Sequence, residues 1–177
     1  MEAQDDVLEA RGLLRHGQSG GSGAGLCCGA PIGARPSTGK ETALDTAADL
    51  IRAHLDAFNR GDRPAMLALL TEDVAHDVNQ GGREVGRDAF AAFMARMDRC
   101  YRERLVDIVV MAEPTGTRAG AEFIVEGEYL ATDEGLPPAA GQRYRLPAGA
   151  FYDIRDGRIA RVTMHYNLQD WIRQVVG

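Results

Sequence analysis

The residues best suited to chemistry lie in the segment 76–79, where His76 stands next to Asp77 shortly before the glycine pair Gly81-Gly82. A carboxylate can abstract a proton, and a neutral imidazole can donate a hydrogen bond to the anion that results. The residues that follow predict a helix over about 87–100 with an apolar face built from Phe90, Phe93, Met94, Met97 and Tyr101. A carboxylate at the mouth of such an apolar pocket is suited to proton transfer on a hydrophobic small molecule.

The strand expected over 74–78 leaves open which of the two residues faces the pocket. Alternation places His76 with Val74 and Val78, and Asp77 with Ala75 and Asn79. The apolar neighbours favour the His76 face as the inner one, although a β-bulge could reconcile both orientations. Adjacent strand residues otherwise point apart, so His76 and Asp77 are not expected to share a metal ion, and no metal site is predicted.

The elements that must position these residues are helices first and strands afterwards. Apolar residues recur at helical spacing from Ala47 to Phe58, with His54 among them, and Asp62 and Pro64 begin a second helix. After the third helix the pattern changes to period two, which predicts strands over 104–112, 119–131, 143–154 and 158–168. Asp156-Gly157 predicts a tight turn between the last two strands. This order predicts an α+β fold in which helices cover one curved antiparallel sheet and enclose a pocket.

Composition narrows the class of protein and its setting. Residues 1–41 are rich in Gly, Ser and Pro, which predicts a disordered tail, or an over-long gene start, ahead of one domain over 42–177. A net charge of −6, with Lys40 as the only lysine, argues against nucleic-acid binding. No run approaches the ~20 apolar residues of a membrane span. Three cysteines without a disulfide framework favour a reduced, cytoplasmic protein, and the Ala, Gly and Arg usage favours a bacterial source.

Two passages resemble a known group of proteins. The first runs from Phe58-Asn59-Arg60-Gly61-Asp62 through Asp77 to Gly86-Arg87, and the second from Gly135-Leu136-Pro137-Pro138 to Asp156-Gly157-Arg158-Ile159. Over about 42–177 the chain resembles the NTF2-like superfamily, and within it the SnoaL-like and ketosteroid-isomerase-related proteins. The resemblance implies a cone of three N-terminal helices packed on a curved antiparallel sheet. It also implies cofactor-free proton transfer, by isomerisation or aldol-type cyclisation, on a hydrophobic carbonyl compound.

The same resemblance assigns roles to single residues. Asp77 stands nine residues before Gly86, at the position of the general base in ketosteroid isomerases. His54 stands seven residues before Gly61, where these enzymes have an oxyanion-hole tyrosine, and a neutral imidazole can donate the same hydrogen bond. Their protonated aspartic acid falls at Ala150, or less well at Gly149, so the resemblance implies that this donor is missing. One of three tyrosines would then replace it: Tyr144, Tyr152 or Tyr166.

We therefore expect Asp77 and His54 to be catalytic. The substrate is expected to contact His76, Asn79, Phe58, Phe90, Phe93, Met94, Met97, Tyr144, Tyr152 and Tyr166. No cofactor is expected. The partners expected are a hydrophobic small molecule and a second copy of the chain, which would bind the outer sheet face toward which His165 points.

Two alternatives stay open. The first is a non-catalytic module that uses the same cone for ligand binding or dimerisation. The second is a hydrolase, which would need an aspartate and an arginine pointing inward together. The alternation of the strands places Arg143, Arg145 and Asp153 on the outer face, so these three residues do not supply that pair.

Overall fold

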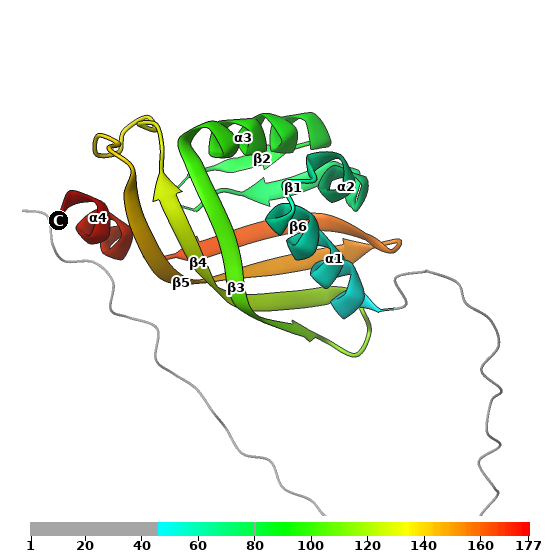
Figure 1. Ribbon diagram of the computed structural model, residues 1–177. Helices are drawn as coiled ribbons and strands as arrows, with labels where there is room; N and C mark the ends of the chain where they lie inside the picture. The colour runs from blue at the N-terminus through cyan, green and yellow to red at the C-terminus, as the bar shows by residue number, and fades with distance from the viewer. Residues whose placement is uncertain (1–45, 80) are drawn as a thin grey trace, which may run out of the picture. The chain divides into compact units, whose positions relative to one another are not determined.

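The structure is a computed structural model that describes residues 46–79 and 81–177. The predicted disordered tail over 1–41 lies outside the described residues. The described part forms an α+β domain with one six-stranded sheet (Figure 1). The predicted fold class is confirmed at this level.

The first two helices begin and end where their capping residues require. Helix α1, Ala47–Asn59, begins after Thr46, whose side chain accepts a hydrogen bond from the backbone N–H of Asp49. The chain leaves α1 through Gly61, which has a φ of +67° that glycine adopts readily. Helix α2, Arg63–Ala68, is capped in the same way by Asp62. Helix α3, Arg87–Cys100, follows Gly86 and buries Phe90 and Met94.

The strands form a single curved sheet in the order β2-β1-β6-β5-β4-β3. Their bounds are β1 Leu70–Asp77, β2 Arg83–Val85, β3 Tyr101–Ala112, β4 Arg118–Tyr129, β5 Gln142–Arg155 and β6 Arg158–Tyr166. Every pair is antiparallel except β1 with β6, which is parallel, so the expected all-antiparallel sheet is wrong for this one pair. Strands β1 and β6 can run in the same direction because β2, α3 and strands β3 to β5 lie between them in the chain, whereas a hairpin would force an antiparallel pair.

Two elements differ from the prediction. The last strand ends at Tyr166 and does not continue to Leu168, because the side chain of Asn167 accepts a hydrogen bond from the N–H of Asp170 and begins helix α4, Leu168–Val176. Trp171 and Val175 of this helix are buried. The short strand β2 was also not predicted, since all three of its residues are exposed and carry no apolar pattern.

The helices and the inner face of the sheet share one apolar core. Helices α1, α2 and α3 lie over this inner face, and α4 packs beside the Gln142 end of β5 (Figure 1). The other face of the sheet is open to solvent, and large apolar side chains remain exposed on it, with 55% of Phe151 accessible. The predicted homodimer through this outer face stays a prediction.

Candidate functional site

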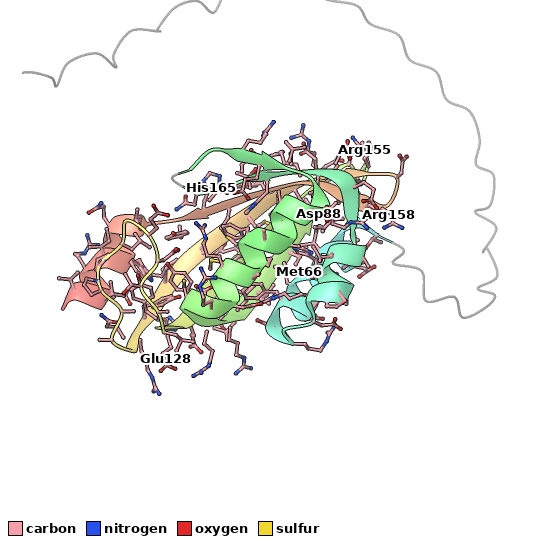
Figure 2. The ribbon with its side chains drawn as sticks, turned by 90° about the horizontal axis from the view of Figure 1, so that it is seen from above. Met66, Asp88, Glu128, Arg155, Arg158 and His165 are labelled. Atoms are coloured by element: carbon pink, nitrogen blue, oxygen red, sulfur yellow. The ribbon has the colours of Figure 1, made fainter. Side chains whose placement is uncertain are left out.

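A cavity of about 370 Å³ lies between helices α1 and α3 and the inner face of the sheet, with α4 and the segment 133–136 at one end. Seen from above, α3 lies across the strands and α2, with Met66, lies beside it (Figure 2). With the single exception of Asp77, the residues predicted from sequence all line this cavity: His54, Phe58, His76, Asn79, Phe90, Phe93, Met94, Met97, Tyr144, Tyr152 and Tyr166.

Strand β1 sends its two polar residues to opposite faces of the sheet. His76 is 4% exposed, and its ring packs edge-on against Phe90 and Phe93 at centroid distances of 5.0 and 4.5 Å. The register shift within β1, between Leu70 and Ala75, ends before these residues and leaves their alternation intact. Of the two orientations that the sequence left open, the structure therefore has His76 inside.

Asp77 lies on the outer face in an ion-pair network. Its carboxylate accepts hydrogen bonds from Arg83 at 2.6 and 3.0 Å and from the Thr163 hydroxyl at 2.8 Å, and Arg161 stands 3.5 Å away. The Arg83 guanidinium holds the pKa of Asp77 far below its ordinary value. The expected carboxylate at the mouth of the apolar pocket is therefore not Asp77, because the alternation of the strand places this residue among cations on the outer face.

The carboxyl residues that line the cavity are Glu103, Asp133 and Glu134. Glu103 belongs to β3 and lies three residues after Cys100, the last residue of helix α3. Its Oε1 atom accepts a hydrogen bond of 2.6 Å from the Tyr144 hydroxyl. Burial raises the pKa of Glu103, although the Tyr144 hydrogen bond and the charge of Arg63 oppose this effect. Burial raises the pKa of the Tyr166 phenol, and the charges of Glu103 and Asp133 add to this effect; Tyr166 lines the same cavity. We refer to Glu103, Tyr144 and Tyr166 as the carboxyl cluster.

A glycine makes the contact between Glu103 and Tyr144 possible. Glu103, Gly127 and Tyr144 are aligned across β3, β4 and β5, so the tyrosine must cross Gly127 to reach the carboxyl. A Cβ atom on Gly127 would overlap the ring and the hydroxyl of Tyr144. The sequence interpretation missed both Glu103 and Gly127. The available signals were the alternation of Glu103 with Tyr101 and Leu105, and a glycine inside a strand, which often marks a close approach.

A second polar group of residues lies at the inner end of the cavity. His54 is 2% exposed and Tyr152 is 1% exposed, and their rings meet edge-on with centroids 6.0 Å apart. Both His54 and His76 pack against Phe90. Burial lowers the pKa of His54 to about 4 and lowers that of His76, so both rings are neutral near pH 7. Burial alone raises the pKa of Tyr152. We call His54, His76 and Tyr152 the inner polar cluster.

The cavity rim near α4 carries an arginine and an aspartate that sequence reasoning had not paired. Arg96 Nε stands 4.0 Å from Asp133, which also accepts a hydrogen bond of 3.1 Å from the Tyr101 hydroxyl. Asp153 and Arg145 are on the outer face, as predicted, where Asp153 pairs with Arg161 and Arg145 with Glu126. The hydrolase alternative thus has an inward pair available, but its aspartate is already held by a phenol.

In 46–79 and 81–177, no three His, Cys, Asp or Glu side chains come together in a way that could hold a metal ion. None of the helices over the same ranges is long and apolar enough to cross a membrane.

Comparison with known proteins identifies the family to which the chain belongs. Residues 51–162 match the SnoaL-like domain. A proposed polyketide cyclase from Pseudomonas putida KT2440 is 64% identical, with a TM-score of 0.73, over 73% of this chain and 98% of that chain. A second proposed polyketide cyclase, from Silicibacter sp. TM1040, is 56% identical, with a TM-score of 0.72, over 76% of this chain and 98% of that chain.

More distant structures share the fold alone. An LEH-like epoxide hydrolase of M. tuberculosis is 17% identical, with a TM-score of 0.56, over 73% of this chain and 89% of that chain. No curated protein matches the sequence. The chain also shares the fold of an NTF2-like protein from Burkholderia pseudomallei. Because the family match spans more than half of the chain, this protein belongs to the SnoaL-like family.

Proposed function

We propose that the protein catalyses cofactor-free proton transfer, by isomerisation or aldol-type cyclisation, on a hydrophobic carbonyl compound held in the cavity. The observation that carries the proposal is the Glu103 carboxyl, which faces an apolar cavity, is hydrogen-bonded to Tyr144 and has a pKa raised by burial. A carboxyl whose pKa lies closer to neutrality is a better general base and acid at ordinary pH. Glu103 takes this role in place of Asp77, because Asp77 lies outside the cavity.

The chemistry uses only side chains of the carboxyl cluster. The Glu103 carboxylate takes the proton from the carbon next to the carbonyl, and the electrons of that C–H bond pass to the carbonyl oxygen to form an enolate. The Tyr166 hydroxyl would donate a hydrogen bond to this oxygen. In an isomerisation, the neutral Glu103 returns the proton to another carbon. In an aldol cyclisation, the enolate carbon attacks a second carbonyl of the same molecule, and Glu103 protonates the new alkoxide.

The cavity volume bounds the size of the substrate. An apolar cavity of about 150 Å³ is large enough for benzene, whereas this cavity measures about 370 Å³. A body of two to three fused rings would therefore fill it. The walls suit such a body, since Phe58, Phe90, Phe93 and Trp171 are among the residues that line the cavity.

The similar structures support this reaction class. Two proteins that are more than half identical to this chain carry the description of a polyketide cyclase. Cyclisation of a polyketide forms a carbon–carbon bond next to a carbonyl, which is the aldol chemistry described above. The proposal does not depend on which polyketide is used.

The test is deuterium exchange into a simple ketone, which needs no knowledge of the natural substrate. 2-Tetralone, a two-ring ketone, is incubated with the full chain in D₂O, and deuterium at the carbons next to the carbonyl is followed by mass spectrometry. The wild type should accelerate exchange, and Glu103→Gln should lower the rate by about 100-fold or more. Binding of 2-tetralone without any acceleration would instead favour the non-catalytic binding module.

A further inference from the structure

We propose that the inner polar cluster binds a hydroxyl group of the substrate. The substrate class would then be a hydroxylated carbonyl compound with fused rings between its hydroxyl and its reacting carbonyl, and with the hydroxyl at the end remote from that carbonyl. The position of the carbonyl rests on the proposed function, whereas the hydroxyl site rests on the inner polar cluster itself.

The first argument is that polar atoms of this cluster are buried and unsatisfied. The Nδ1 atoms of His54 and His76 are both buried and have no hydrogen-bond partner among the described residues. Neither a charge nor a hydrogen bond contributes to the raised pKa of Tyr152. A buried polar group without a partner costs about 1–3 kcal/mol. Two such imidazoles that line one cavity, beside the Tyr152 hydroxyl, indicate a place where a ligand supplies the missing bonds.

The second argument is that the three residues lie at one level of the cavity. In the register of the sheet, His76 of β1 pairs with Val162 of β6, and Val162 pairs with Tyr152 of β5. His76 and Tyr152 are thus two strands apart on the inner face, roughly 10 Å between backbones. His54 reaches the same level from helix α1, since its ring packs on Tyr152 and Phe90. One oxygen atom of a ligand can therefore be shared among them.

The third argument concerns the kind of oxygen that fits. The Glu84 carboxylate stands 3.7 Å from Nδ1 of His76, too far for a hydrogen bond, so this atom stays unsatisfied like Nδ1 of His54. The Nδ1 atom of a neutral imidazole either donates or accepts, according to the tautomer, and a hydroxyl satisfies it in both cases, whereas a carbonyl or an ether can only accept. Both imidazoles are neutral near pH 7, so the cluster does not favour an anionic group. Tyr152 can donate to the same hydroxyl oxygen.

The fourth argument separates this hydroxyl from the reacting carbonyl. Tyr144 of the carboxyl cluster and Tyr152 of the inner polar cluster are both on β5, eight residues apart. This separation corresponds to roughly 26 Å along an extended strand, which is more than two fused rings span, so a two-ring ketone bound in the inner polar cluster tests the hydroxyl site by itself. Because apolar residues such as Leu146 and Ala148 line the cavity between them, the ligand that joins the two clusters has an apolar middle and a polar group at each end.

The experiment compares three ketones of one shape: 2-tetralone, 6-hydroxy-2-tetralone and 6-methoxy-2-tetralone. Dissociation constants for the full chain are measured by calorimetry at pH 7. We expect the hydroxy compound to bind about tenfold or more tightly than the other two. His76→Phe, which keeps an aromatic ring against Phe90 and Phe93, should remove most of this preference, and Tyr152→Phe should reduce it. His165→Gln, which removes an exposed imidazole from the outer face, should leave it unchanged.

The outcomes separate this inference from the proposed function. Equal binding of the hydroxy compound and 2-tetralone would overturn the hydroxyl site, even if deuterium exchange depends on Glu103. Equal binding of the hydroxy and methoxy compounds would overturn it as well, because the ether oxygen donates no hydrogen bond. Glu103→Gln should abolish exchange and keep the hydroxyl preference. A preference that persists in a protein without any exchange activity would support the site and reject the proposed reaction.

Discussion

A carboxyl group on the outer face of the sheet and one on the inner face have pKa values shifted in opposite directions. On the outer face, Asp77 is surrounded by Arg83, Arg161 and Thr163, and its pKa is lowered. On the inner face, Glu103 meets the phenol of Tyr144, and no cation stands within 4.0 Å of it in the described residues. Burial therefore dominates at Glu103 and raises its pKa. The proton affinity of each carboxyl group thus depends on its surroundings: cations lower the pKa on the outer face, and burial raises it on the inner face.

The largest expected effect comes from removing each carboxylate in turn. Glu103→Gln and Asp77→Asn are both nearly isosteric, and both remove one potential negative charge. We expect Glu103→Gln to reduce deuterium exchange into 2-tetralone by about 100-fold or more, and Asp77→Asn to change it by less than about threefold. A large loss of exchange in Asp77→Asn, with exchange retained in Glu103→Gln, would reverse the assignment of the base.

The histidines give the next contrast. Burial lowers the pKa of His54 to about 4, whereas an imidazole in an unfolded chain has a pKa of 6.5. The unfolded chain thus takes up a proton between pH 6.5 and 4 that the folded protein does not, so stability falls as the pH is lowered through this range. The shift corresponds to about 3 kcal/mol at pH 4 and below. Chemical denaturation at several pH values should show this loss in the wild type.

The matched variants are His54→Phe and His165→Gln. In His54→Phe the free energy of unfolding should fall less steeply between pH 6.5 and 4, because no proton is taken up at this residue on unfolding. His165→Gln removes an exposed imidazole of the outer face and should keep the wild-type slope. Identical slopes in all three proteins would show that His54 is not held in its neutral form.

Two glycines of β4 provide the third contrast. A Cβ atom on Gly127 would overlap the Tyr144 ring, whereas one on Gly120 would lie 3.5 Å from Phe151, an ordinary contact. We expect Gly127→Ala to lower the free energy of unfolding by about 1–3 kcal/mol and to slow exchange, and Gly120→Ala to do neither. Adding Tyr144→Ala should restore stability in the Gly127→Ala background, since the clash needs both side chains. Additive losses in that double variant would argue against the clash.

The sequence was sufficient for the parts of the fold that local patterns determine. Helices α1 and α3 follow from apolar spacing, and the β5–β6 hairpin follows from Asp156-Gly157, whose two residues both have positive φ. Helix α4 was missed because Leu168 continues the period-two pattern of β6, and the change at Asn167 depends on a single capping side chain. These failures concern boundaries, where one hydrogen bond decides between two regular structures.

The site was harder to predict, because it depends on which face each residue occupies. The spacing of Asp77 before Gly86 matches ketosteroid isomerases, yet the alternation of β1 places this carboxylate outside. Glu103 lies between Arg102 and Arg104 and just before the strand predicted over 104–112, although Tyr101 and Leu105 share its face. The importance of Gly127 becomes visible only when β3, β4 and β5 are aligned. Long-range register of this kind is not encoded in local spacing.

The smallest expected effect is a shift in the pH dependence of exchange, and it tests how the inner face tunes its carboxyl. The Tyr144 hydroxyl donates to Glu103 and stabilises the carboxylate, which opposes the effect of burial on the pKa. Tyr144→Phe removes this donor alone and leaves the ring over Gly127. The pKa of Glu103 should then rise further, so the exchange rate, which increases as Glu103 loses its proton, should reach half of its plateau at a higher pH than in the wild type. The same variant should leave the Asp77 ion pairs intact. A profile that moves to lower pH, or does not move, would mean that Tyr144 acts on the substrate and not on the proton affinity of Glu103.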